Sequence, residues 1–234
     1  IIGHQTTGTL SSAQYNTAVG LTAMDAITTG DNNSALGYGT LSALTTGTNN
    51  VAIGTGALDA GNPSYNVAVG VNALGAVATG TSNVAVGTGA LGANTTGTVS
   101  VAVGHDALAA STTADNNVAV GNLALNANTT GSGNTAVGST ALDANTTAAN
   151  NTAVGYAALL LNTTGADNVA VGSAAADANT TGANNVAIGT SAFSTNTTGS
   201  QNVAVGDQAL EANTTAAYNT GVGWKALEAN STGA

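Results

Sequence analysis

The chain has 234 residues with one Lys or Arg, eleven Asp or Glu, two His and no Cys, and its formal net charge is −10. A single cation is too few for a nucleic-acid-binding surface or for docking on an anionic membrane. No apolar run approaches the ~18 residues of a membrane span, so we expect no membrane insertion in this segment.

One repeat occupies the whole chain, and its marker is the glycine of motifs such as NVAVG. With this glycine as position 5, the consensus reads N-V-A-V-G-x-x-A-L-x-A-N-T-T-G-x-x. Successive markers are 17 residues apart, except for one step of 16. They are Gly20, Gly37, Gly54, Gly70, Gly87, Gly104, Gly121, Gly138, Gly155, Gly172, Gly189, Gly206 and Gly223.

The regular period predicts a single repeat domain over residues 1–234. The short repeat lies near residues 59–65, beside Pro63, the only proline, and indicates a remade turn and not a domain boundary. Because the chain begins and ends inside a repeat, and solenoids need capping repeats, we expect it to be a fragment of a longer fibre.

Along each repeat, positions 1–5 alternate in period two and are rich in β-branched residues, which predicts a short strand. Positions 8–11 fit either a second strand or one helical turn, and we favour the strand because so few residues cannot stabilise a helix alone. N-T-T-G is a turn, and the marker glycine makes another corner. The prediction is an all-β fold, a parallel β-solenoid or β-roll of about thirteen 17-residue coils.

The strand register decides which columns form the core. We expect positions 2, 4, 9 and 11 to face inward, so Val137 and Leu142 should both be buried. Positions 3 and 8, such as Ala136 and Ala141, then face outward, and their constant small size predicts a neighbouring copy of the chain. The alternative is a register slipped by one residue, which puts both alanine columns inside. Ala176 stands where other repeats have Leu, so its layer should be underpacked or filled from a neighbour.

The recurring NVAVGTGAL motif resembles the YadA-like head repeats of trimeric autotransporter adhesins. It is also similar to repeat shafts of phage tail fibres and bacterial surface fibres. The resemblance covers essentially the whole chain, although the 17-residue period is longer than the roughly 14-residue head repeat. It implies a homotrimer with adhesive or fibre-shaft roles, and it transfers no catalytic residues.

Few side chains are candidates for chemistry. His4 and His105 both occupy position 6 but are six coils apart, roughly 30 Å at the strand spacing, so they cannot share a metal within one chain. Three copies of His105 around a trimer axis could, but a surface corner is favoured. Asp106 and Asp115 add little, because His105 should point away from Asp106.

Position 10 carries an acidic column, for which a solvated face is favoured over a cation site: Asp25, Asp59, Asp143, Asp177, Glu211 and Glu228.

Other recurring groups have a structural and a functional interpretation. N-T-T is a formal glycosylation acceptor, but stacked amide ladders explain its recurrence without glycans; these asparagines are Asn94, Asn128, Asn145, Asn162, Asn179, Asn196 and Asn213, with Asn230 opening N-S-T. Adjacent threonines should point to opposite sides, which argues against an ice-binding array. Aromatic residues near corners could stack on sugars or be scattered surface residues: Tyr15, Tyr38, Tyr65, Tyr156, Tyr218 and Trp224. The degenerate GTGALG from Gly87 to Gly92 lacks a following helix and is no phosphate loop.

These observations predict a non-enzymatic structural or adhesive fibre segment, the shaft or head of a surface adhesin or phage tail fibre. It would be extracellular, on a cell surface or virion, with itself as partner in a homotrimer and a host-surface glycan or protein as a further partner. We expect no catalytic, cofactor or metal site. The alternative is a self-assembling extracellular filament or sheath subunit. An ice-binding solenoid is less favoured, as is a carbohydrate-active β-helix enzyme, which needs basic groups beside acids.

Overall fold

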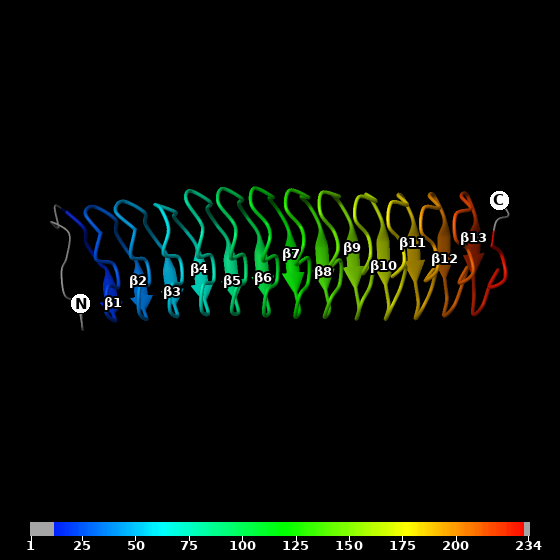
Figure 1. Cartoon of the computed structure of the whole chain (residues 1–234), viewed down its shortest axis with the longest axis horizontal. Coiled ribbons are helices and arrows are strands. Elements are labelled where there is room, and N and C mark those ends of the chain that lie inside the picture. The colour runs from blue at the N-terminus through cyan, green and yellow to red at the C-terminus, as the bar shows by residue number, and fades with distance from the viewer. Residues whose placement is uncertain (1–11, 232–234) are drawn as a thin grey trace. The chain divides into compact units, whose positions relative to one another are not determined.

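A computed structural model describes residues 12–231, and these residues form a parallel β-solenoid with one short strand in each coil and no helix. The chain divides into two compact units, Ile1–Asn116 and Asn117–Ala234. Within unit 1 the strands are β1 (Thr17–Val19), β2 (Ser34–Leu36), β3 (Val51–Ile53), β4 (Val67–Val69), β5 (Val84–Val86) and β6 (Val101–Val103) (Figure 1). Within unit 2 they are β7 (Val118–Val120), β8 (Thr135–Val137), β9 (Thr152–Val154), β10 (Val169–Val171), β11 (Val186–Ile188), β12 (Val203–Val205) and β13 (Thr220–Val222).

Consecutive strands within each unit pair in parallel, and every residue lies beside the same repeat position of the next coil. Ala85 pairs with Ala102 in unit 1, and Ala170 pairs with Ala187 in unit 2. A constant period produces this register, because each coil must bring the same residue back to the same place. The predicted 17-residue coil is therefore confirmed.

The 16-residue repeat is a remade turn inside unit 1. Strands β3 and β4 still pair position for position, with Val51 beside Val67. The Asn62 carboxamide oxygen accepts hydrogen bonds from the backbone N–H groups of Thr45 and Thr46, at 2.7 and 2.8 Å. These bonds join the shortened turn to the coil before it, so the lost residue does not interrupt the stack.

The second strand expected at positions 8–11 is absent from the described coils, where this segment is a series of turns. The Ala90 N–H donates to Gly87 O at 3.3 Å, and the Asn94 N–H donates to Leu91 O at 3.1 Å. Leu91 itself has a φ of 51°, in the left-handed region, which a strand does not allow. Its N–H still bonds to Ala107 O of the next coil at 3.0 Å, so hydrogen bonding between coils continues where the strand does not.

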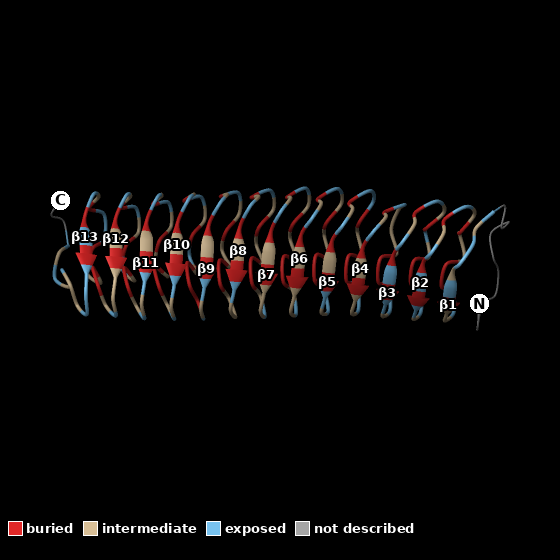
Figure 2. Ribbon diagram, turned by 180° about the vertical axis from the view of Figure 1, so that it is seen from behind, coloured by how far each residue is buried: buried red, intermediate tan, exposed pale blue. Residues whose placement is uncertain are grey.

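The sequence predicted that positions 2, 4, 9 and 11 face the coil interior. This prediction is wrong for positions 2 and 4, which lie on the strand, and right for position 9. Ala136, Ala141 and Leu142 are fully buried, whereas Val137 is 36% exposed. The slipped register is the correct one: alanines of positions 3 and 8 fill the coil interior with the leucine of position 9, and positions 2 and 4 face outward. Figure 2 colours the ribbon by this burial. Position 11, exemplified by Ala93, is half-buried.

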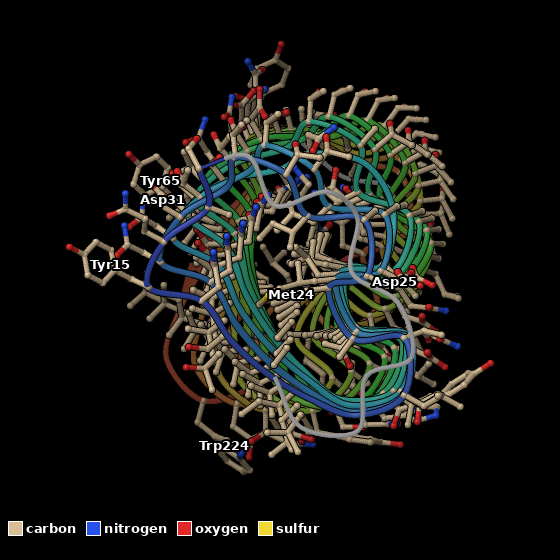
Figure 3. All side chains as sticks on the ribbon, turned by 90° about the vertical axis from the view of Figure 1, so that its left-hand side faces the viewer. Tyr15, Met24, Asp25, Asp31, Tyr65 and Trp224 are labelled. Atoms are coloured by element: carbon tan, nitrogen blue, oxygen red, sulfur yellow. The ribbon has the colours of Figure 1, made fainter. Side chains whose placement is uncertain are left out.

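The narrow coil explains why alanine is inside. Strand β13 has Gly221 at position 3, and a Cβ added there would meet Leu210 Cγ at 3.2 Å and Ala226 O at 3.0 Å. Positions 3, 8 and 9 therefore meet across a space that admits one long side chain, and Figure 3 shows Met24, at position 9, pointing into it. Valine at position 3 would overpack this space.

The marker glycine is required by the backbone. Gly138 has a φ of +139°, which L residues with a side chain rarely adopt, and a Cβ there would overlap the carbonyl of Gly155 in the next coil. Coils approach too closely at this corner for any side chain.

Asparagine at position 1 forms a buried ladder that ties the coils together. Asn134 is fully buried, its Nδ2 donates to Ala148 O at 2.9 Å within its own coil, and its Oδ1 accepts the N–H of Asn151 at 2.9 Å in the next coil. The same pattern recurs in unit 1, where Asn50 Nδ2 donates to Pro63 O. Each carboxamide therefore satisfies buried backbone groups that no strand reaches.

Candidate interaction surface

The outward columns at positions 2 and 4 form an uncharged face on the sheet of each unit. Position 4 contains only Val, Leu and Ile, and position 2 contains only Val, Thr and Ser. In unit 2, Val137, Val154 and Val171 are each 36% exposed and Ile188 is 39% exposed. A solvated sheet face ordinarily alternates to polar or charged side chains. We call these two columns the apolar face.

A shallow hollow of 190 Å³ lies on the apolar face of unit 1, over β1, β2 and β3. Its walls are the position-2 residues Thr17, Ser34 and Val51 and the position-4 residues Val19, Leu36 and Ile53, with Ala35 and Ala52 between them. Ser34 is the smallest residue in its column, and Leu36 projects with half of its surface exposed. The hollow therefore results from the short Ser34 side chain, which lies beside the longer side chains of Leu36 and Ile53.

The acidic column at position 10 is half-buried along its length. Burial raises the pKa of Asp59, Asp143 and Asp177 above the usual value. A hydrogen bond from the Asn126 side chain, at position 10 of the preceding coil, partly opposes the effect on the pKa of Asp143. No group of three His, Cys, Asp or Glu side chains within residues 12–231 has the arrangement of a metal site.

The two histidines have different outcomes. His4 lies outside the described residues. His105 is exposed at a corner, and its Nδ1 lies 3.3 Å from the Asp106 carboxylate. The prediction that His105 points away from Asp106 is therefore wrong: the left-handed backbone at Asp106, with φ 52°, is not extended, so neighbouring side chains need not alternate. His105 is exposed and Asp106 is half-buried, and the pair is an ordinary surface contact.

The asparagines of N-T-T in unit 2 are buried, and so is Asn94 in unit 1. Asn162 Nδ2 donates to Gly165 O at 2.9 Å and to Asn145 Oδ1 at 3.2 Å. This is the predicted amide ladder. A carboxamide nitrogen with both hydrogens in buried hydrogen bonds is inaccessible for glycan transfer in the folded coil. Asn230, in N-S-T, is half-buried.

The paired threonines point to different environments, as the sequence predicts. Thr163, at position 13, is half-buried and its hydroxyl donates to Thr180 O of the next coil at 3.0 Å. Thr164, at position 14, is exposed. In this coil, only the second threonine is exposed.

The aromatic residues at corners are exposed, and Figure 3 shows Tyr15 and Tyr65 projecting outward. Trp224 is 73% exposed and lies 5.5 Å from the Lys225 ammonium, which also pairs with Glu228 at 2.7 Å. The hydrogen bond to Glu228 raises the pKa of Lys225. Lys225 is the single cation of the sequence and its charge is matched locally, so unit 2 presents no basic surface.

Within residues 12–231, no helix is long and apolar enough to cross a membrane. Comparison with protein-family models, with curated proteins and with solved structures finds no match for this chain. The similarity to adhesin head repeats and fibre shafts thus stays a prediction from the motif. The sequence predicted no site residue, and it assigned the apolar face to the core. A detectable signal was present: across thirteen repeats, positions 2 and 4 contain no charged residue.

Proposed function

We propose that the chain is a structural or adhesive fibre segment, the shaft or head of a surface adhesin or phage tail fibre, which spaces or presents a binding tip outside the cell or on a virion. In this proposal three copies associate side by side through the apolar face. The observation that carries it is the absence of charge and the exposure of aliphatic side chains along that face.

The size of the face supports association. In unit 2, positions 2 and 4 together expose on the order of 500 Å² of mainly apolar surface, which is in the range of the largest patch on a soluble monomer, and such patches are often functional. The strongly acidic chain repels its own copies, but the repulsion acts over the other faces and is screened by salt. Copies should therefore associate more strongly as salt is added.

A matched pair of charge substitutions tests the proposal. Val137→Asp puts a carboxylate on the apolar face of β8, and Thr130→Asp puts one on the exposed position-14 column of the preceding coil. Because Val137 points outward, neither change introduces a charge into the coil interior. We expect light scattering to give three times the 22.0 kDa chain mass for the parent and for Thr130→Asp, and a much reduced association for Val137→Asp.

Two results would contradict the proposal. A parent that scatters as a monomer at every concentration rules out association through this face. A parent whose mass grows without limit as concentration rises indicates the alternative function, an open-ended filament or sheath subunit, because a closed trimer stops growing while a heterologous stack does not.

A further inference from the structure

The apolar face carries little information about alignment. Four consecutive strands, β4 to β7, have the same residues, Val-Ala-Val. Sliding one copy along another by one coil, ~4.8 Å, would bring nearly identical side chains back into contact. An assembly built on such a face alone would therefore be free to slip, as uniform strands are. Alignment has to come from coils that depart from the repeat.

Within unit 1, the coil that contains β2 departs most from the usual residues of the apolar face. It combines Ser34, the smallest side chain of its column, with Leu36, which is longer than the valine usual at position 4. The side chain between them is slightly less covered: Ala35 is 4% exposed, whereas Ala52 and Ala68 are fully buried. A projecting side chain and a recess thus occupy the same coil, on the same face.

The recess has the size and chemistry for an aliphatic side chain. A cavity of ~150 Å³ lined by aliphatic groups is enough to bind benzene, so the 190 Å³ hollow over β1–β3 has room for a leucine side chain. Its lining includes Val19, Val51 and Ile53 and carries no charge. Its polar lining residues, Thr17 and Ser34, are both exposed.

We infer that the hollow over β1–β3 receives the Leu36 side chain of a second copy of this chain, and so fixes the copies parallel and in register. This inference rests on the proposed side-by-side assembly. When copies are related by rotation about an axis along the coil stack, position 4 of one chain meets position 2 of the next, coil by coil. Leu36 then faces the recess at Ser34, and every other coil meets its own counterpart.

Other alignments lose this fit. A slip of one coil places Leu36 against Thr17 or Val51 and leaves Val19 or Ile53 at the recess. An antiparallel arrangement centred on β2 retains the fit there, but it overlaps only the strands near β2 and leaves β4, β5 and β6 unpaired on that face. Only the parallel, in-register arrangement uses both the recess and the whole face of unit 1.

The absence of cysteine from the sequence makes the register directly measurable. Single-cysteine chains are mixed in pairs, one member carrying a mass tag, and oxidised. Val86→Cys (position 4 of β5) with Val84→Cys (position 2 of β5) reports the in-register alignment. Val86→Cys with Val67→Cys on β4 or with Val101→Cys on β6 reports slips of one coil in either direction. A disulfide forms only when the Cα atoms come within ~7 Å.

We expect the in-register pair to crosslink about fivefold more than either slipped pair, since burial of each extra methylene favours one alignment several-fold. In the background Ser34→Val with Leu36→Val, which gives β2 the residues of β4, the three yields should become equal within about twofold. Because other coils already hold these residues, the variant should fold as the parent does, and circular dichroism checks this.

The outcomes separate this inference from the proposed function. If the parent is a monomer, no pair crosslinks and the side-by-side assembly itself is refuted. If the parent assembles and the in-register preference survives Ser34→Val with Leu36→Val, the assembly stands and the recess is not its register device. If slipped pairs dominate in the parent, the Leu36 contact does not form.

Discussion

The position-1 ladder makes a prediction that depends only on the solenoid and not on its function. Asn134→Ala removes a carboxamide that donates to Ala148 O and accepts from the N–H of Asn151, both at 2.9 Å. Alanine can do neither, and both backbone groups lie beside a fully buried position. Ala148 O retains its hydrogen bond from Asn145 Nδ2 at 3.1 Å, so only the Asn151 N–H is left without a partner. An orphaned buried backbone group costs ~1–3 kcal/mol, so the substitution should destabilise the coil by about 1–4 kcal/mol, including a small void.

Urea unfolding followed by circular dichroism measures this loss, and Thr130→Ala is its control. Thr130 lies four residues before Asn134 and its side chain is exposed, so trimming it should change stability by less than ~0.5 kcal/mol. Because a repeat array can unfold in stages, the midpoint and the slope are both compared. Equal midpoints for Asn134→Ala and the parent would refute the bridging role of the ladder.

Three further predictions concern single layers of the core. Ala176, 2% exposed, is followed at position 9 of the next coil by Phe193, which is fully buried. We expect the large Phe193 side chain to occupy the volume that Ala176 leaves, so Ala176→Leu should cost ~1–3 kcal/mol alone and far less together with Phe193→Leu. A double-mutant cycle in urea measures this coupling, and two effects that simply add contradict it. The buried Ser111 hydroxyl has no hydrogen-bond partner within residues 12–231. An asparagine there can donate to Ala114 O, as Asn94 does to Gly97 O, so Ser111→Asn should raise the free energy of unfolding by ~1 kcal/mol. A lower urea midpoint for this variant contradicts the prediction. Asp59, Asp143 and Asp177 have higher pKa values in the folded chain than in the unfolded chain. The folded chain therefore binds protons more readily, and its stability should rise as pH falls from 7 towards 4. Asp143→Asn with Asp177→Asn should flatten that trend, and a urea midpoint that falls with acidification in the parent but not in this variant contradicts the raised pKa values.

The period and the coil were predictable from the sequence because both follow from the regular recurrence of the same residues. Residues that return every 17 positions, with a glycine whose φ excludes other residues, must stack on their own copies, as Gly138 and Gly155 do. The shortened turn at Pro63 was predictable for the same reason, since Gly70 resumes the pattern at once.

The orientation of the strand was not predictable from pattern alone. Val-Ala-Val alternates in either register, and hydrophobic size favours valine inside, although the coil interior at β13 has no room for it. That limit is set by the distance between the strand and the turns opposite, where Leu91 and its equivalents adopt positive φ. No local sequence rule predicts leucine in that conformation, because tertiary contacts between coils hold it there.

The hollow at β2 was equally out of reach, since it depends on how side chains of three stacked strands differ in length. The position-1 ladder had a signal, because asparagine in twelve of thirteen repeats exceeds what a turn requires. A turn residue can be replaced by glycine, aspartate or serine, whereas a buried bridge between coils needs a donor and an acceptor on one short side chain.

The distribution of side-chain size across the strand connects the fold to the proposed assembly. A solenoid that worked alone would gain solubility from threonine, lysine or glutamate at positions 2 and 4, which contribute nothing to its interior. Val137 and Val154 instead leave a third of their surface in water, while the interior of the same strands is built from alanine. Each coil thus places more aliphatic surface outside its strand than inside it, and this arrangement is stabilising only when another surface covers it. In the assembly proposed above, the apolar face would add a second hydrophobic layer between chains to the Ala and Leu core inside each coil.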